Sequence, residues 1–161
     1  MAFTLDPDST LEQLRTVHRA FIDSSSIIYA EKAGVLNLLC GTLQLQTVPG
    51  VVREVGFALP DISVGPEIDP GMPVDDQLLA SAAKAHLAVI SEDRKLLMKA
   101  DGGGLDAYNM LVMLELLLLR GHVSLGEWDV ARKRLLAAAQ YSAWVVHAGQ
   151  QLHWAVRKEV G

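Results

Sequence analysis

Residues 76–96 read DQLLASAAKAHLAVISEDRKL, and this stretch decides the fold that the sequence predicts. Its first half has apolar residues at helical spacing, behind a cap supplied by Asp75 or Asp76. Residues 87–90, LAVI, then have the uninterrupted apolar character of a buried strand. The strand leads directly to Asp93, so a helix and a buried strand together deliver a carboxylate at the strand's carboxyl end.

An earlier stretch shows the same arrangement. Residues 20–22, AFI, form a short apolar run that ends in Asp23, and the serines 24–26 follow as residues that start a helix. A second strand is predicted over 43–48 and ends at the Pro49–Gly50 dipeptide. Strands that alternate with helices favour a parallel sheet, and right-handed crossovers bring the carboxyl ends of its strands to one edge.

Further helices are predicted between and after these strands. Pairs with capping-box spacing mark the helices near the two ends of the chain, and they are Ser9 with Glu12 or Thr10 with Gln13, and Ser124 with Glu127. The other predicted elements are helices over 35–39, 51–59, 94–100, 109–120 and 143–158, and a short strand around Ile62 and Val64. An apolar stripe near the C-terminus packs on the core or docks a second subunit. It consists of Tyr141, Trp144, Val145, Leu152 and Trp154.

Length and composition fit one globular domain. The chain has 161 residues, enough to bury one sizeable core, and its 50% hydrophobic and 20% charged residues argue against disorder. We expect a single domain over residues 1–161, with its core over about 20–125, an added N-terminal helix over about 8–19 and C-terminal helices over about 124–158.

The charge balance limits how the protein can hold nucleic acid. A formal net charge of −5 argues against a broad electrostatic grip on phosphates, because such binding depends on Lys and Arg contacts. A nuclease with this balance needs a metal ion and local basic patches. Several basic residues near Asp93 are candidates for an RNA path, although such residues more often form only a solvated helix face. They are Lys84, Arg94, Lys95 and Lys99.

Several kinds of site are excluded by residue type and spacing. Cys40 is the only cysteine, which rules out an internal disulfide and a multi-cysteine zinc site, and its apolar neighbours predict a buried thiol. The glycines 102–104 lack the downstream Lys and Ser or Thr of a phosphate-binding loop. The histidines show no ligand spacing, so we predict no zinc. They are His18, His86, His122, His147 and His153.

The apolar segments predict neither a membrane helix nor a signal peptide. Residues 114–119 are the densest apolar stretch, but Glu115 and Arg120 hold it well below the ~20 residues that span a bilayer. Residues 1–3 lead into Asp6 without a basic region or a continuous apolar core. We therefore expect a cytoplasmic protein.

Acidic residues recur where the predicted sheet brings chain segments to one edge. Asp23 and Asp93 each end a strand, Asp76 starts the helix between them, and Glu54 lies on the helix after the second strand. Each alone also fits an ordinary role as a helix cap, turn residue or solvated residue, and Asp75 is an alternative to Asp76. Their shared edge position predicts a common acidic site.

This arrangement resembles the PIN-domain family. The family's early strand that ends in Asp is matched by FIDSS over 21–25, and its helical Glu by VVREV over 51–55. Its third and fourth acidic positions are matched by DQLLASA over 76–82 and VISEDRKL over 89–96. The resemblance covers roughly residues 20–125.

The resemblance implies a PIN-like three-layer α/β domain, with a central parallel sheet flanked by helices, that acts as a Mg²⁺- or Mn²⁺-dependent endoribonuclease. It implies that Asp23, Asp76 and Asp93 are catalytic metal ligands and that Glu54 is a ligand or orients water, and hard divalent ions do prefer such oxygen donors. Carboxylates in one cleft raise one another's pKa, so metal binding should release protons. RNA is then the substrate, and a homodimer or an antitoxin protein is the protein partner that the family allows.

Two other interpretations stay open. A PIN-like module that binds RNA or protein without catalysis fits the acidic net charge and the extra terminal helices. A phosphatase of the HAD type also presents an Asp at a strand end, but that family expects a second Asp two positions later, where Ser25 stands. Ser25 or Ser91 instead suits a hydrogen bond to a ligand carboxylate, which would fix its rotamer.

Overall fold

A five-stranded parallel sheet organises the computed structural model, which describes residues 6–161. The strands lie in the order β3-β2-β1-β4-β5, and every neighbouring pair is parallel. Residues 1–3, from which the prediction about a signal peptide starts, lie outside the described residues. The strands are β1 (Arg19–Ile22), β2 (Gln44–Thr47), β3 (Ile62–Val64), β4 (Ala88–Ile90) and β5 (Ala107–Tyr108).

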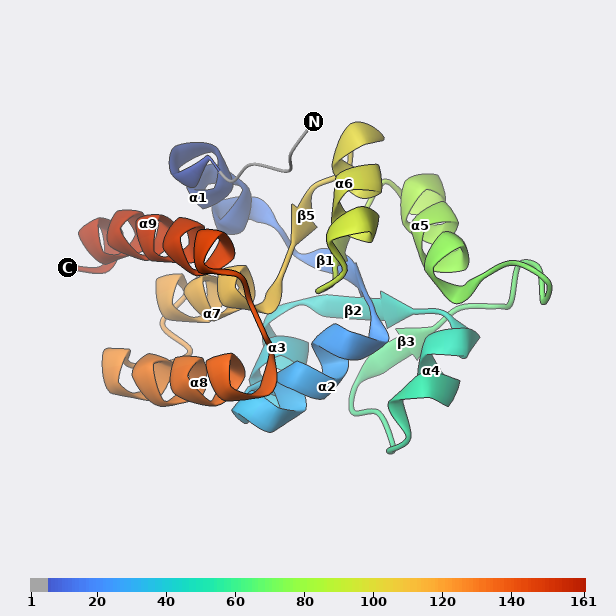
Figure 1. Cartoon of the computed structure of the whole chain (residues 1–161), viewed down its shortest axis with the longest axis horizontal. Helices are drawn as coiled ribbons and strands as arrows, with labels where there is room; N and C mark the ends of the chain where they lie inside the picture. The colour runs from blue at the N-terminus through green and yellow to red at the C-terminus, as the bar shows by residue number, and fades with distance from the viewer. Residues whose placement is uncertain (1–5) are drawn as a thin grey trace.

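Helices cover both faces of this sheet (Figure 1), with α2 and α3 on one face and α5 and α6 on the other. This confirms the predicted α/β class, with a central parallel sheet between helices and extra helices at both ends of the chain. The helices are α1 (Pro7–Thr16), α2 (Ser24–Ala33), α3 (Leu36–Thr42), α4 (Pro49–Val55), α5 (Val74–Ala85), α6 (Arg94–Gly102), α7 (Met110–Leu119), α8 (Leu125–Ala138) and α9 (Ala143–Val160).

The strand order reverses between β1 and β4. From β1 the chain adds β2 and β3 on one side, and α5 then carries it back to β4 on the other side. Ile22 of β1 lies opposite Ile90 of β4, so the two strands end side by side. In open α/β sheets, ligands bind beyond the carboxyl ends of the strands at such a reversal. The residues after Ile22 and Ile90 therefore stand where a site is expected.

A buried polar group joins the three C-terminal helices. Glu115 lies on α7, and its Oε1 accepts a 2.9 Å hydrogen bond from Trp128 Nε1 of α8. His153 of α9 places Nδ1 3.0 Å from both Glu115 carboxylate oxygens, and its ring stacks on Trp128 with centroids 3.8 Å apart. All three side chains are buried. The apolar packing of α8 on α2 and of α9 on α7 and α1 surrounds them.

Several boundaries differ from the prediction for local reasons. The predicted N-terminal capping box is wrong, because α1 starts at Pro7 behind Asp6 and has no side-chain cap, whereas the box of Ser124 is confirmed. Helix α4 ends at Val55, not near residue 59, because Gly56 adopts a left-handed φ of 79°. Neither Asp75 nor Asp76 caps α5, whose N-cap is Pro73. Strand β5 was not predicted.

Three further predictions concern which residues are buried and whether a helix could cross a membrane. Cys40 is only half-buried and lies at the margin of the core, so the prediction of a fully buried thiol is wrong. The C-terminal apolar stripe splits, since Leu152 is buried whereas Trp144 and Trp154 are 55% and 57% exposed. None of the helices described over residues 6–161 is both long enough and apolar enough to cross a membrane.

The packing of α4 against α5 predicts a sensitive glycine. A Cβ added at Gly50 would lie 2.6 Å from Val74 Cγ2 and 3.2 Å from Val74 Cγ1, and valine has little rotamer freedom to move away. Gly50→Ala should therefore lower the free energy of unfolding by about 1–3 kcal/mol, as overpacking does. Urea denaturation would measure the loss.

Gly41→Ala is the matched control for this change. Gly41 also lies in a helix, α3, but a Cβ there meets nothing within 4 Å. The substitution should leave stability unchanged or raise it by up to about 1 kcal/mol, because alanine favours helix more than glycine does. Equal effects of the two substitutions would show that Val74 yields without cost.

Candidate functional site

Asp23 is held rigidly at the carboxyl end of β1. It is the N-cap of α2, and its side chain is 4% exposed. Its Oδ1 accepts a 2.7 Å hydrogen bond from the Ser24 backbone N–H, and its Oδ2 accepts a 3.0 Å hydrogen bond from Ser91 Oγ. Burial raises the pKa of Asp23 and the charge of Glu54 adds to the rise, whereas the hydrogen bonds from the two serines oppose it.

Ser91 connects Asp23 to Asp93. Ser91 Oγ donates to Asp23 and accepts a 3.0 Å hydrogen bond from the Asp93 backbone N–H. Asp93 in turn caps α6, since its Oδ1 accepts hydrogen bonds from the backbone N–H groups of Lys95 and Leu96 at 2.8 and 3.3 Å. The acids that end β1 and β4 are thus joined through one hydroxyl, which is the kind of contact predicted for Ser91.

Glu54 reaches the same edge from α4. Ser24 Oγ donates a 2.7 Å hydrogen bond to Glu54 Oε2, while the Ser24 backbone N–H binds Asp23. One serine therefore fixes two carboxylates of different helices. On α2 the contacts that were predicted for Ser25 are made by Ser24, one residue earlier.

The two acids at the start of α5 have different surroundings. Partial burial raises the pKa of Asp75, and the charges of the acids at 23, 93, 54 and 76 raise it further. Asp76 is 48% exposed, and its Oδ1 lies 3.9 Å from Lys99 Nζ on α6. Asp75 is the more exposed of the two residues, but the charges of the other acids act on its carboxyl, so we count it with them. We refer to Asp23, Glu54, Asp75 and Asp93 as the carboxylate cluster.

The carboxylate cluster has the oxygen donors that suit a hard divalent cation, but its side chains are spaced too widely to bind one in their present positions. Within residues 6–161, no three Asp, Glu, His or Cys side chains stand close enough to hold one metal ion in their present positions. Its donors are carboxylate oxygens, which Mg²⁺ and Mn²⁺ prefer. None of its members forms an ion pair with another described residue. A shared cation would compensate this charge once the side chains turned toward it.

Glu92 is a site residue that the sequence analysis missed. It follows Ser91 at a bend in the chain and directly precedes Asp93. Its carboxylate accepts hydrogen bonds from Ser26 Oγ at 2.6 Å, from the Met110 backbone N–H at 3.2 Å and from the Tyr141 hydroxyl. Burial raises the pKa of Glu92, and these hydrogen bonds oppose the rise. The only signal in the sequence was its place between Ser91 and Asp93.

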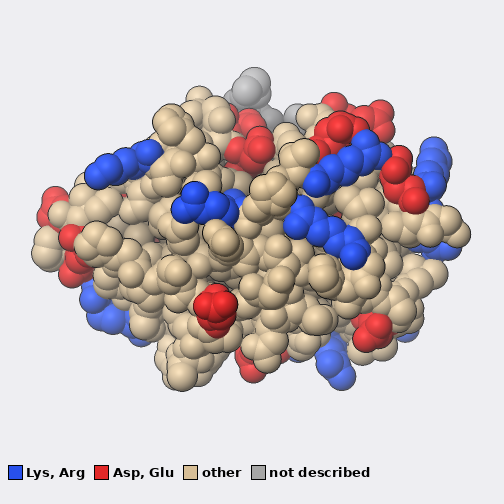
Figure 2. Space-filling view, turned by 180° about the vertical axis from the view of Figure 1, so that it is seen from behind, with Lys and Arg blue, Asp and Glu red and all other residues tan. Residues whose placement is uncertain are grey.

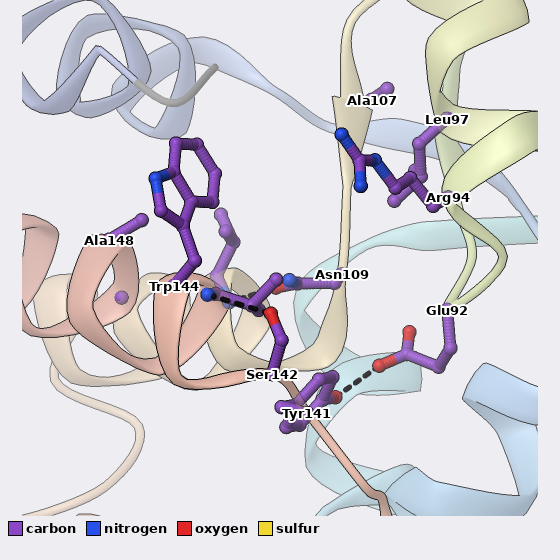
Figure 3. Close-up of a pocket in the computed structure, with 12 residues that line it drawn as sticks. Glu92, Arg94, Leu97, Ala107, Asn109, Tyr141, Ser142, Trp144 and Ala148 are labelled. Atoms are coloured by element: carbon purple, nitrogen blue, oxygen red, sulfur yellow. Dashed lines mark hydrogen bonds between the residues drawn. The ribbon is translucent and has the colours of Figure 1, made fainter. Parts of the chain in front are cut away.

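A cavity of about 410 Å³ opens beside Glu92 (Figure 3). It lies between α6, the end of β5 and the start of α9, where Arg94 and Trp144 stand on opposite sides of it. The wall is mainly apolar, and polar groups are few. The polar and aromatic residues that line it are Glu92, Arg94, Asn109, Tyr141, Ser142 and Trp144.

Basic residues do not gather into one patch on the face seen from behind the view of Figure 1. Figure 2 shows Lys and Arg side chains scattered among acidic ones on that face. The arrangement agrees with the net charge of −5 and with the expectation that any RNA contact is local.

No protein-family model matches this chain, and no curated protein matches it in sequence. Among solved structures, it matches a PilT N-terminus domain protein from the hyperthermophilic archaeon Sulfolobus solfataricus P2. The match covers 77% of this chain and 96% of that one, with a TM-score of 0.43 and 13% sequence identity.

The sheet itself bears on the resemblance seen in the sequence. Five parallel strands in the order β3-β2-β1-β4-β5, with helices on both faces, are consistent with the PIN fold. The roles of individual acids are a separate matter, because function depends on the site and not on the fold. The function proposed below therefore rests on the residues of this chain.

Proposed function

We propose that this protein is a divalent-metal-dependent endoribonuclease that hydrolyses RNA phosphodiester bonds at the carboxylate cluster. The observation that supports this most is the convergence of acids without ion-pair partners beyond the ends of β1 and β4. Partial burial raises the pKa of Asp75 and the charges of the other acids raise it further, so a cation would relieve the repulsion within the cluster. Such perturbed groups at a strand reversal are typical of functional sites.

In this proposal Asp23, Asp75 and Asp93 hold Mg²⁺ or Mn²⁺, and Glu54 is a further ligand or orients a water molecule. The cation would supply an acidified water for attack on phosphorus and charge stabilisation for the departing oxygen. Asp23 and Asp93 are suited to hold it because they follow neighbouring strands and are joined through Ser91. Ser24 gives Glu54 a fixed direction through its 2.7 Å hydrogen bond.

Asp75 takes the place in this proposal that the sequence analysis gave to Asp76. Asp76 lies beside Lys99 Nζ, and this cation already offsets part of its charge. Lys99 is in turn a candidate for contact with an RNA phosphate, because the ion pair is exposed and long. Asp76 then orients Lys99 and does not bind metal.

Asparagine substitutions at the two neighbouring acids test the function and this assignment together. With Mn²⁺ and a mixed set of single-stranded and structured RNAs, the wild type should cleave, and EDTA should abolish cleavage. Asp75→Asn should lower both the cleavage rate and calorimetric Mn²⁺ affinity by about tenfold or more, since changes around metal ligands commonly cost 10–100-fold. Asp76→Asn should keep Mn²⁺ affinity within about threefold of wild type.

The outcomes separate the alternatives. A larger loss of metal affinity in Asp76→Asn than in Asp75→Asn would return the ligand role to Asp76. A folded wild type that neither takes up Mn²⁺ nor cleaves any RNA would refute the nuclease proposal. The second candidate function, a PIN-like module without catalysis that binds RNA or protein, would then stand, and the spacing of the cluster favours it.

A further inference from the structure

The cavity beside Glu92 adjoins the carboxylate cluster through the short segment 91–94. Ser91 and Asp93 contribute to the cluster side, whereas Glu92, between them, lines the cavity. Arg94, the next residue, also lines the cavity. A polymer bound across this segment would therefore meet the cluster and the cavity within a few atoms of backbone.

The walls of the cavity suit a flat, mainly apolar group. Its volume of about 410 Å³ lies within the range of about 300–1,000 Å³ that is usual for small-molecule sites. Leu97, Val112 and Val145 supply apolar surface, and Gly149 leaves room because it has no side chain. Trp144 is 55% exposed at the edge of the cavity, so much of its ring is free to be covered. An exposed tryptophan beside an apolar hollow is a stacking surface.

The polar groups of the cavity suit a base and a phosphate. Asn109 Oδ1 already accepts from the Val112 backbone N–H, which leaves its amide NH₂ group to donate to a ligand. Ser142 Oγ accepts from the Val145 backbone N–H and keeps its own proton to donate. Arg94 forms no ion pair with any residue described over 6–161. Its guanidinium is therefore available for a phosphate oxygen.

We propose that this cavity holds an unpaired nucleobase of single-stranded RNA, stacked on Trp144, while Arg94 contacts an adjoining phosphate. The inference builds on the proposed nuclease function, because it names the substrate that the cluster acts on. Stacking on aromatic side chains is the usual way in which proteins hold splayed bases of single-stranded RNA. A duplex, whose bases are already stacked and paired, has no base to offer the cavity.

Metal-free binding tests the cavity apart from catalysis. Fluorescence anisotropy in EDTA would compare a labelled single-stranded RNA, its duplex, and single-strand versions that each lack one base. The wild type should bind the single strand more tightly than the duplex, and removal of one particular base should weaken binding about tenfold. Trp144→Ala should weaken single-strand binding to a similar extent and make the loss of that base neutral.

Trp154→Ala is the matched control. Trp154 lies on the same helix and is 57% exposed, but it does not line the cavity. The Trp154→Ala variant should bind RNA as the wild type does. The Arg94→Ala variant should weaken binding to intact and base-deleted strands alike. The proposal is overturned if Trp154→Ala and Trp144→Ala behave alike, or if loss of the base is as costly in Trp144→Ala as in wild type.

The result is independent of the nuclease assignment. If RNA binding depends on the base through Trp144 but the protein never cleaves RNA, the base-binding proposal is supported and the nuclease proposal is refuted. If the protein cleaves RNA with metal but Trp144→Ala leaves RNA binding unchanged, the nuclease proposal is supported and the base-binding proposal is refuted.

Discussion

Asp23→Asn should abolish Mn²⁺ uptake and lower RNA cleavage by more than about 100-fold while the protein stays folded. Asparagine has the same shape, is an equally good N-cap, and can still accept from the Ser24 backbone N–H. What it removes is the buried negative charge at the centre of the cluster. Calorimetry with Mn²⁺ and a single-turnover cleavage assay would measure the two losses on the same samples.

The melting temperature gives this prediction a second readout. Without metal, Asp23→Asn should stay close to wild type in stability, because relief of the burial and Glu54 penalties on the ionised carboxylate offsets loss of the hydrogen bond that Ser91 Oγ donates to Asp23. Added Mn²⁺ should raise the melting temperature of the wild type, as any ligand of the native state does, but not that of the variant.

Asp129→Asn is the control for loss of one carboxylate. Asp129 lies on α8, is 50% exposed and pairs with Lys133, and it is not a member of the cluster. It should bind metal and cleave like wild type. Full cleavage and metal uptake by Asp23→Asn would show that the cluster is not the catalytic site.

Glu115→Ala should lower the free energy of unfolding by about 3–5 kcal/mol, the largest stability change that we expect in this chain, because each buried polar group left without a partner costs about 1–3 kcal/mol and the cavity adds to the loss. The substitution leaves Trp128 Nε1 without its acceptor, deprives His153 Nδ1 of its partner and opens a cavity between α7, α8 and α9. Urea denaturation at neutral pH would measure the loss. A loss below about 1 kcal/mol would mean that water replaces the carboxylate.

The same group predicts how stability depends on pH. Burial raises the pKa of Glu115 from 4.5 to about 8, against the opposing effects of the Trp128 hydrogen bond and the Arg132 charge. Burial lowers the pKa of His153 from 6.5, and the charges of Arg157 and Arg132 lower it further. The folded protein therefore favours a neutral carboxyl beside a neutral imidazole.

The sign of the pH effect follows from these directions. A raised carboxyl pKa contributes stability that is complete below about pH 4.5 and is lost as pH rises through about 8. The lowered pKa of His153 contributes stability that is complete above 6.5 and is lost as pH falls below it. Of these two groups, only Glu115 differs in protonation between the folded and the unfolded chain from pH 6.5 to about 8, so its contribution to stability should fall over that interval. Glu115→Gln cannot ionise and should remove the slope.

The predictable part of the site was the part with local causes. Asp23 and Asp93 were found because a buried strand followed by a capping residue is a pattern of a few neighbouring positions. The choice between Asp75 and Asp76 was not local, since adjacent residues on a helix point about 100° apart. Only the docking of α5 against the sheet decides which of them faces the other acids.

Long-range contacts account for what the sequence analysis missed. Glu92 meets Tyr141 across 49 residues of chain, and no spacing rule connects the two. The cavity exists because α9 returns to the end of β5, which depends on how the last helices pack. Strand β5 has only 2 residues and is defined by its pairing with β4, so periodicity could not reveal it.

A hydrogen bond of Glu92 connects the C-terminal helices to the sheet edge where the acids lie. Tyr141, in the link between α8 and α9, holds the residue that directly precedes Asp93. A displacement of α9 that moves Tyr141 would therefore disturb the backbone that positions Asp93. Shortening this chain after α7 would remove Tyr141 and one side of the cavity, and so alter the acidic edge from a distance. The packing of the C-terminal helices and the position of the chain before Asp93 therefore depend on each other.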